Sequence, residues 1–267
     1  MTSIAQIRVE TQRLPNGGAI RWLTGDNAAR MNAWTQAMWG ALPELLSEAD
    51  RDPDVRVIVL TGAGDRAFSA GADISEFDAE PPAQQATRHN DFDNSAFGAL
   101  INCGKPVIAM IHGICFGGGC ELALCCDFRI AAETAKFSIP AARLGIGYNA
   151  RWIKPLINVV GSAKAKEILM TARRYDAQQA LRMGLVGDVV SAAELRAVTE
   201  KLAMDLASNA PLSMRAAKLC VDALSHPDGA VDMAKLDRAV LACFESADFA
   251  EGKRAFAEKR APNFSGR

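Results

Sequence analysis

The chain has 267 residues, of which 49% are hydrophobic and 23% charged, and its 30 basic residues nearly balance its 31 acidic ones. This composition is typical of a globular protein with a sizeable core, built as one main domain or as one domain with a small C-terminal addition. The balanced charge excludes a strongly basic surface, so we expect neither nucleic acid nor a membrane as a partner.

The first residues and the cysteines indicate the compartment in which the protein works. The first residues lack the basic start and apolar stretch of a secretory signal, and no apolar run has the length that spans a bilayer. The seven cysteines lie mostly in apolar runs, which indicates reduced thiols packed as small hydrophobic groups. We therefore expect a cytoplasmic protein. Because no paired Cys-x-x-Cys segments are present, we expect no metal site.

The chain opens with a predicted hairpin and a helix. Residues 7–9 and 19–23 are β-like segments on either side of a Pro/Asn/Gly turn at 15–18. A helix is then expected to begin with Asn32 as its N-cap. Pro43 is expected to interrupt or kink that helix, since proline removes a backbone donor.

Three later runs are short and apolar, as buried strands are. Helical patterns precede or follow them, and this alternation favours an α/β fold with a largely parallel sheet. The predicted strands are residues 55–60, 107–111 and 128–131.

The second half of the chain is mainly helical. Its Ala-rich amphipathic segments predict a helical cap or an oligomerisation arm. We assign residues 1–200 to the core and residues 201–267 to a C-terminal helical oligomerisation or cap region. The predicted helices are residues 177–183, 192–207, 212–224 and 234–244.

Two glycine-bearing loops, residues 61–73 and 112–122, each follow a predicted buried strand. Ligands bind at this edge of open α/β sheets. The first loop also matches a relaxed dinucleotide fingerprint, but the strand and acidic residue that should complete that unit do not follow. The sequence therefore does not support a nicotinamide site.

Taken together, the two loops suit a different chemistry. Gly117, Gly118 and Gly119 remove every β-carbon at the start of a predicted helix, so a ligand carbonyl can approach free backbone N–H groups. Glu121 stands three residues after Gly118, on a neighbouring face of that helix. With a second N–H from the first loop, the site could hold the oxyanion of a thioester enolate beside a carboxylate. The alternative is structural: a tight turn, with Glu121 satisfying the helix N-terminus.

Two segments about fifty residues apart, Ala67–Ile74 and Gly117–Ala123, resemble the signature segments of the crotonase (enoyl-CoA hydratase/isomerase) superfamily. The resemblance extends over nearly the whole chain. Further matching segments are Arg30–Ala33, Ala180–Val186, Glu251–Arg260 and Asn263–Phe264.

The resemblance implies a crotonase-like spiral of ββα units with a helical C-terminal region, assembled as a homotrimer or a dimer of trimers. It implies an acyl-CoA substrate, with coenzyme A as part of the thioester and no tightly bound cofactor. The N–H groups of Ala72 and Gly118 would form the oxyanion hole, and Glu121 would be a catalytic acid/base. The implied coenzyme A contacts are Arg30, Asn32, Ala33, Ala70, Gly71, Ala72, Asp73, Ile74 and Lys259.

One departure from the family pattern concerns the reaction. Hydratases with two glutamates carry the second acid directly after a proline, where this chain has Pro140-Ala141. Hydration normally shares its proton transfers between two carboxylates. The nearby segment containing Tyr148 resembles methylmalonyl-CoA decarboxylases, which lack the second glutamate, although those enzymes have a histidine in place of Ala72.

Several functions therefore stay open. The first is an enoyl-CoA hydratase-like lyase with Glu121 as acid/base, and a decarboxylase that uses Glu121 and Tyr148 or an enoyl-CoA isomerase are alternatives. A non-catalytic scaffold that binds coenzyme A is an alternative of another class. His112 and Asp73, beside the glycine loops, are expected to hold the loops in place rather than to act chemically.

Overall fold

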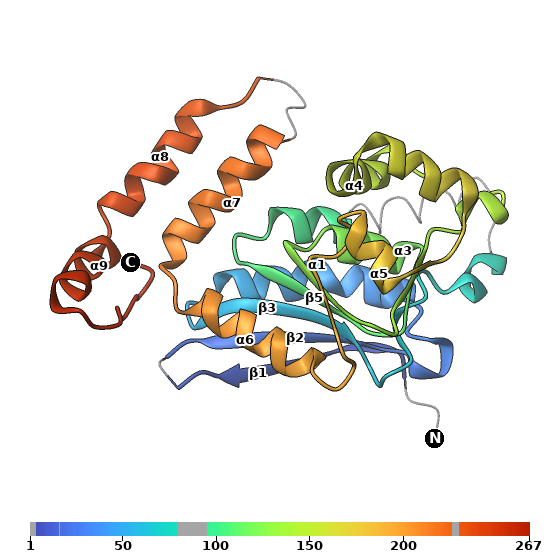
Figure 1. Ribbon diagram of the computed structural model, residues 1–267, viewed down its shortest axis with the longest axis horizontal. Helices are drawn as coiled ribbons and strands as arrows, with labels where there is room; N and C mark the ends of the chain where they lie inside the picture. Colours follow the sequence, from blue (N-terminus) through green and yellow to red (C-terminus); the bar gives the residue numbers. More distant parts are fainter. Residues whose placement is uncertain (1–3, 16, 80–94, 226–229) are drawn as a thin grey trace.

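The computed structural model describes residues 4–15, 17–79, 95–225 and 230–267. A six-stranded sheet lies at its centre, with helices on both faces (Figure 1). The strands next to one another are parallel from β2 to β10, and β1 is an antiparallel edge. In order across the sheet they are β1 (Gln6–Arg13), β2 (Ala19–Asp26), β3 (Val55–Gly62), β5 (Val107–Ile111), β7 (Phe128–Ala132) and β10 (Asp188–Val190).

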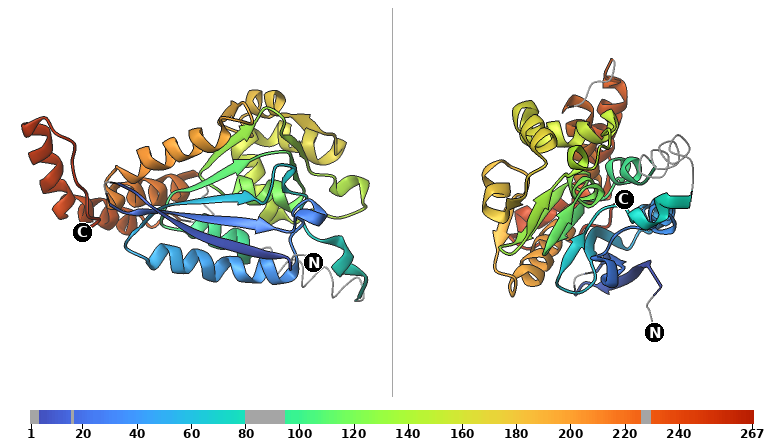
Figure 2. Two further views of the ribbon diagram at one scale, coloured as in Figure 1. Left: turned by 90° about the horizontal axis from the view of Figure 1, so that it is seen from below. Right: turned by 90° about the vertical axis from the view of Figure 1, so that its right-hand side faces the viewer.

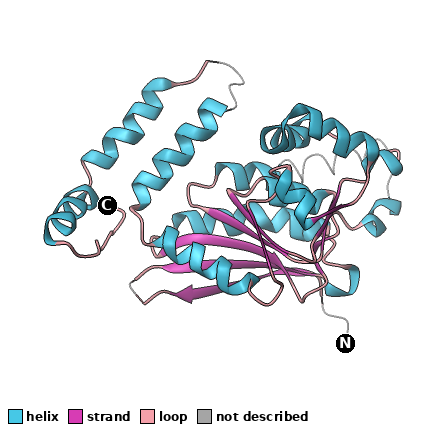
Figure 3. Cartoon of the chain, viewed as in Figure 1, coloured by secondary structure: helices cyan, strands magenta, loops and turns pink. Residues whose placement is uncertain are grey.

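A second, four-stranded sheet is formed by short strands that the sequence did not predict (Figure 3). Two of its strands lie inside the glycine-bearing loops, and they pair in parallel. This pairing holds the two loops side by side. The strands are β4 (Ala67–Ser69), β6 (Ile114–Phe116), β8 (Lys136–Ser138) and β9 (Tyr175–Asp176).

The helices confirm the α/β class, and they include α4 and α9, which the sequence did not predict. Residues 95–102 are also helical. The α-helices are α1 (Gln36–Arg51), α3 (Gly118–Leu124), α4 (Ala150–Thr171), α5 (Ala177–Arg182), α6 (Leu195–Ala207), α7 (Pro211–Ser225), α8 (Met233–Phe244) and α9 (Ala247–Glu258). The 3-10 helices are η1 (Ala28–Arg30), η2 (Ile74–Ala79) and η3 (Ala141–Arg143).

Side chains alternate between the two faces of the large sheet, because successive residues of a strand point in opposite directions. On β3, Ile58 and Leu60 join the core on the side of α1 and α3, whereas Val57 and Val59 join the core beneath α6. Both faces of the strand are buried, as its continuous apolar sequence predicted.

The start of the first long helix differs from the prediction. The N-cap of α1 is Thr35, whose hydroxyl accepts a hydrogen bond from the N–H of Met38 at 3.3 Å. Asn32 is buried before the helix in a left-handed conformation, with φ of 52°. Its side chain binds the backbone of the first glycine loop instead of a helix N–H. Pro43 does not interrupt α1, which continues from Gln36 to Arg51.

Helices α7, α8 and α9 form a C-terminal arm that extends away from the sheet (Figures 1 and 2). Ion pairs join α7 to the body, from Arg215 to Asp50 at 3.2 Å and from Lys218 to Asp127 at 2.8 Å. Within the described ranges, no helix combines the length and the apolar character needed to cross a membrane.

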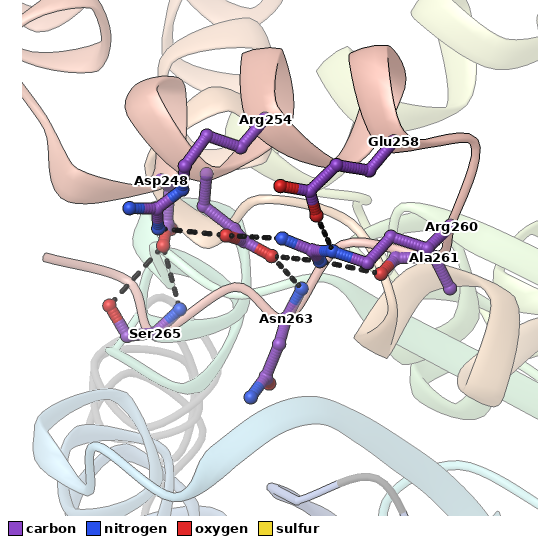
Figure 4. Close-up of polar contacts among 8 residues, drawn as sticks. Asp248, Arg254, Glu258, Arg260, Ala261, Asn263 and Ser265 are labelled. Atoms are coloured by element: carbon purple, nitrogen blue, oxygen red, sulfur yellow. Dashed lines mark hydrogen bonds and ion pairs between the residues drawn. The ribbon is translucent and has the colours of Figure 1, made fainter.

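The end of the arm is held by a polar network (Figure 4). Glu251 of α9 is buried and accepts hydrogen bonds from Arg260, Arg254 and the N–H of Asn263. Asp248 accepts hydrogen bonds from the N–H groups of Ser265 and Gly266, close to the end of the chain. The last residues therefore fold back onto α9.

Candidate active site

The two glycine-bearing loops meet at Gly71 and Gly118. A β-carbon added at Gly71 would lie 3.1 Å from the backbone nitrogen of Gly118 and 3.0 Å from the carbonyl oxygen of Phe116. A β-carbon added at Gly118 would lie 3.8 Å from the nitrogen of Ala72. The close approach depends on Gly71, where a β-carbon would be crowded by the second loop and where a φ of 97° also favours glycine.

The backbone amides at this meeting point are available to a ligand. The N–H of Asp73 donates to Trp34, and the N–H of Gly117 donates to Ser138. In the described part of the chain, the N–H groups of Ala72 and Gly118, which lie between or beside these, donate no hydrogen bond. Unpaired backbone donors in a buried region are rare, and they commonly serve a ligand.

Glu121 lies on the first turn of α3, and its side chain is fully buried. Neither of its carboxylate oxygens accepts a hydrogen bond of ordinary geometry within the described residues. Burial raises the pKa of this carboxyl well above its usual value, the neighbouring Cys120 adds to the rise, and a looser interaction with the Tyr148 hydroxyl opposes it. A buried carboxyl without a countercharge lowers the stability of the fold, and such a group is typical of a catalytic acid or base.

A row of four aromatic side chains runs from Gly118 to the neighbourhood of Glu121. The indole of Trp39 approaches to 3.2 Å from the position of a β-carbon at Gly118. Ring centroids then follow one another at 5.5, 6.2 and 5.3 Å, each pair close to edge-to-face. The members of this aromatic row are Trp39, Phe97, Trp152 and Tyr148.

Sequence reasoning singled out only Tyr148 of this row. The other three come from α1, from helical residues 95–102 and from α4, so no local motif connects them. Each also fits an ordinary core position at helical spacing. Only the tertiary contacts bring them to the site.

The structure places no second acid at the position that follows Pro140. Ala141 begins η3 and is buried in the main core. A methyl group carries no titratable proton, so Glu121 is the one carboxyl among the sequence-predicted catalytic residues that the structure keeps at this site.

The segments predicted to bind coenzyme A lie against each other. The N–H of Ala70 donates to Met31 at 2.9 Å, and the N–H of Trp34 donates to Gly71 at 2.7 Å. Residues 30–33 therefore run beside residues 70–73, next to the amide of Ala72.

Within these segments the side chains have different surroundings. Arg30 forms an ion pair with Asp73 at 2.8 Å and remains half-exposed, and Ile74 is exposed. Burial alone would raise the pKa of Asp73, but hydrogen bonds from Ser75 and the contact with Arg30 together lower it. Asp73 thus binds its own loop, as the sequence indicated.

Two further residues named from the sequence, Lys259 and His112, have different surroundings. Lys259 is exposed and follows α9, a helix of the C-terminal arm that lies far from α3 in Figure 1. His112 is buried, and burial lowers its pKa. Its carbonyl accepts from the N–H of Phe68, which ties the two loops together.

Comparisons with known proteins identify the family of this chain. A model of the enoyl-CoA hydratase/isomerase family matches residues 17–267. The chain is 34% identical over 247 residues to the short-chain-enoyl-CoA hydratase of Clostridium acetobutylicum, covering 92% of this chain and 94% of the relative. It is 37% identical over 265 residues to the carnitinyl-CoA dehydratase of Salmonella typhi, covering 97% and 99%.

A solved structure gives the same result for the fold. The enoyl-CoA hydratase/carnithine racemase of Magnetospirillum magneticum superposes with a TM-score of 0.92 at 35% identity, covering 99% of this chain and 97% of that one. The expected crotonase-like fold is therefore confirmed.

Proposed function

Since the chain belongs to the enoyl-CoA hydratase/isomerase family, we propose that it is a lyase that adds water to, or removes it from, an acyl-CoA thioester. The observation that carries this proposal is the fully buried Glu121 beside the meeting point of two loops with unpaired amides. Ala72 and Gly118 supply the oxyanion hole, and coenzyme A is part of the substrate.

In the dehydration direction, Glu121 as carboxylate removes the proton from the α-carbon. The electron pair moves into the thioester, and the resulting enolate oxygen is held by the N–H groups of Ala72 and Gly118. The enolate then expels the β-hydroxyl, which takes the proton from Glu121 and leaves as water. One carboxyl carries the proton through the whole cycle, so Ala141 is compatible with this route.

The high pKa of Glu121 suits this cycle. Removed from water, the carboxylate is a stronger base than a solvated one. The interaction with the neighbouring Tyr148 opposes this rise in pKa without cancelling it.

The paired segments 30–33 and 70–74 are the proposed coenzyme A contacts, because they lie directly beside the amide of Ala72. Arg30 is the exposed cation there, suited to a phosphate. Lys259 caps α9 in the C-terminal arm, so its part in binding depends on how the arm is placed when chains assemble.

Decarboxylation is a second candidate, favoured by one observation. Glu121 has Tyr148 as its neighbour and Ala141 in place of a second acid. Loss of carbon dioxide from a malonyl-type thioester requires an oxyanion hole and one acid to protonate the enolate, and this site has both.

Product analysis by mass and by ultraviolet absorbance separates these functions. The protein is incubated with crotonyl-CoA, methylmalonyl-CoA and a 3-enoyl-CoA, in separate reactions. A gain of water on crotonyl-CoA supports the lyase, and loss of carbon dioxide from methylmalonyl-CoA supports the decarboxylase. Movement of the double bond of the 3-enoyl-CoA leaves the mass unchanged, so the ultraviolet absorbance of the conjugated 2-enoyl thioester reports it, and its appearance supports an isomerase. Binding of all three without any product would overturn the enzyme proposal in favour of a scaffold.

We also propose a cytoplasmic homotrimer or dimer of trimers, assembled through the C-terminal arm. Helices α8 and α9 expose large apolar side chains, including Leu241, Phe244 and Phe256, the last at 88%. Exposed apolar surface of this kind commonly marks a protein contact. Sedimentation equilibrium of the full chain tests it, and a monomer at micromolar concentration would contradict it.

A further inference from the structure

Trp39 holds a buried hydrogen-bond donor that nothing in the described structure satisfies. Its side chain is 2% exposed, and its indole Nε1 has no hydrogen-bond partner. Buried tryptophan N–H groups normally find an acceptor, because leaving one unpaired is unfavourable. An indole nitrogen only donates, so the missing partner must be an acceptor.

The position of this donor is fixed by the contacts of the ring. Cζ2 of Trp39 lies 3.2 Å from where a β-carbon of Gly118 would stand, and Nε1 is two covalent bonds from Cζ2. The ring also contacts two aromatic neighbours: Trp34, tilted by 46° with centroids 4.8 Å apart, and Phe97, edge-to-face at 5.5 Å. The ring atoms nearest the position of a Gly118 β-carbon are Cζ2 at 3.2 Å and Cη2 at 3.4 Å. Because Nε1 is on the same long edge of the indole as Cζ2, the free N–H lies next to the part of the ring that contacts the glycine loop.

The residues around the site form a closed circuit of contacts. Gly118 contacts Trp39, the aromatic row connects Trp39 to Tyr148, Tyr148 interacts with Glu121, and Glu121 is on the same helix, α3, as Gly118. If the thioester oxygen accepts a hydrogen bond from the N–H of Gly118, the first carbons of the acyl chain lie inside this circuit of residues. Trp39 contacts the β-carbon position of Gly118 directly, so an acceptor within a few bonds of the thioester carbon is the one best placed to meet its N–H.

We propose that the Trp39 indole N–H donates a hydrogen bond to an oxygen on the β-carbon of the acyl group, and so selects β-oxygenated acyl-CoA thioesters over plain hydrocarbon ones. A β-hydroxyl, a β-carbonyl and a β-carboxylate all present such an acceptor. A hydrocarbon chain buries the same N–H without a partner. The inference rests on the proposed binding of the thioester at Gly118, and it concerns specificity rather than proton transfer.

The test compares two ligands that differ mainly in this oxygen and that the proposed hydration cannot consume. Acetoacetyl-CoA carries a β-carbonyl, and butyryl-CoA has none. Their dissociation constants are measured by calorimetry on the full-length parent protein and on Trp39→Phe, which keeps an aromatic ring and loses the N–H. We expect Trp39→Phe to weaken acetoacetyl-CoA binding by about five- to tenfold and to change butyryl-CoA binding by less than about twofold.

Trp22→Phe is the matched control. Trp22 is equally buried, but it lies in the core on the other face of the sheet, and its Nε1 already donates to Gln12. It should leave both dissociation constants unchanged. Because both ligands are measured on one preparation, the ratio of the constants is independent of how much of a variant is folded.

A second measurement is made on the parent protein, and Trp39→Phe serves only to assign one resonance. The chain has four tryptophans, so a ¹⁵N-labelled sample gives four indole N–H resonances. Acetoacetyl-CoA should shift one resonance, absent from Trp39→Phe, downfield relative to butyryl-CoA. Equal shifts, or equal weakening of both ligands in Trp39→Phe, would overturn the inference while leaving the proposed function standing. Failure of both thioesters to bind the parent protein would overturn both.

Discussion

Glu121 in the body and Glu251 in the C-terminal arm are both buried carboxylates, and their surroundings differ in kind. Glu251 is surrounded by donors, and its hydrogen bonds with Arg260, Asn263 and Arg254 lower its pKa well below the usual range (Figure 4). Among the described residues Glu121 has only the looser interaction with the Tyr148 hydroxyl, and burial raises its pKa.

The contrast separates two uses of a buried charge. A carboxylate whose lone pairs are all engaged stabilises the structure that surrounds it and has little capacity left for a substrate. A carboxyl left without partners makes its surroundings less stable, but it can take up and release a proton at a ligand. The arm contains the first kind, and the candidate site contains the second.

The largest effect is expected from Glu121→Gln. Removing the proton carrier should lower kcat on the active thioester by about 10²- to 10⁴-fold, while acyl-CoA binding persists because the backbone amides are untouched. Steady-state rates and calorimetric binding measure the two quantities. Glu251→Gln is the counterpart in the arm, and its kcat per assembled protein should remain near that of the parent. Equal losses in both variants would contradict the distinction between the two carboxylates.

The next effect is expected from Gly71→Ala. The added methyl group would stand 3.1 Å from the Gly118 nitrogen and obstruct the oxyanion hole, so kcat/KM should fall by about 10²-fold or more.

Gly64→Ala is its matched control. Gly64 is in the same loop, also has positive φ, at 72°, and has open space where the methyl group would lie. Both variants carry a left-handed strain of about 1–2 kcal/mol, which thermal melting would show. Only Gly71→Ala should lose activity, and a comparable loss in Gly64→Ala would attribute the effect to strain.

Tyr148→Phe should have a smaller effect. It removes the interaction that lowers the pKa of Glu121, so that pKa rises further. The limb of the pH–rate profile that reports deprotonation of Glu121 should move to higher pH, with kcat at neutral pH lower by about tenfold. A profile that keeps its position would show that Tyr148 does not act through Glu121.

The smallest effect concerns stability against pH. The pKa of glutamate in an unfolded chain is about 4.3. Because the pKa of Glu251 is lowered by folding, its contribution is present above that pH and is lost as the pH falls. The raised pKa of Glu121 acts in the opposite direction, and stability decreases as the pH rises from about 4.3 toward its folded value.

Melting temperatures of the parent and the two glutamine variants from pH 3 to pH 9 test these opposite signs. Glu251→Gln should differ most from the parent at neutral pH and least in acid. Glu121→Gln should be at least as stable as the parent at neutral pH, with the difference vanishing in acid. If both variants changed the melting temperature at neutral pH in the same direction, the contrast between the two carboxylates would be contradicted.

The sequence by itself determined five of the six strands of the large sheet, both glycine loops and the position of the carboxyl. Runs such as residues 55–60 and 107–111 are strands because their apolar side chains are buried on both faces. Glu121 and Gly118 are neighbours on one helix, so their spacing carries the geometry directly.

Tertiary structure decided what lies around them. Asn32 has the side chain of a helix N-cap, but the carbonyls of the folded first loop bind it, and Thr35 caps α1 instead. The aromatic row draws on three helices far apart in the chain, so its apolar residues have no local signal that separates them from core. Whether a buried donor or carboxyl has a partner depends on contacts between distant segments, and such contacts exist only once the chain has folded.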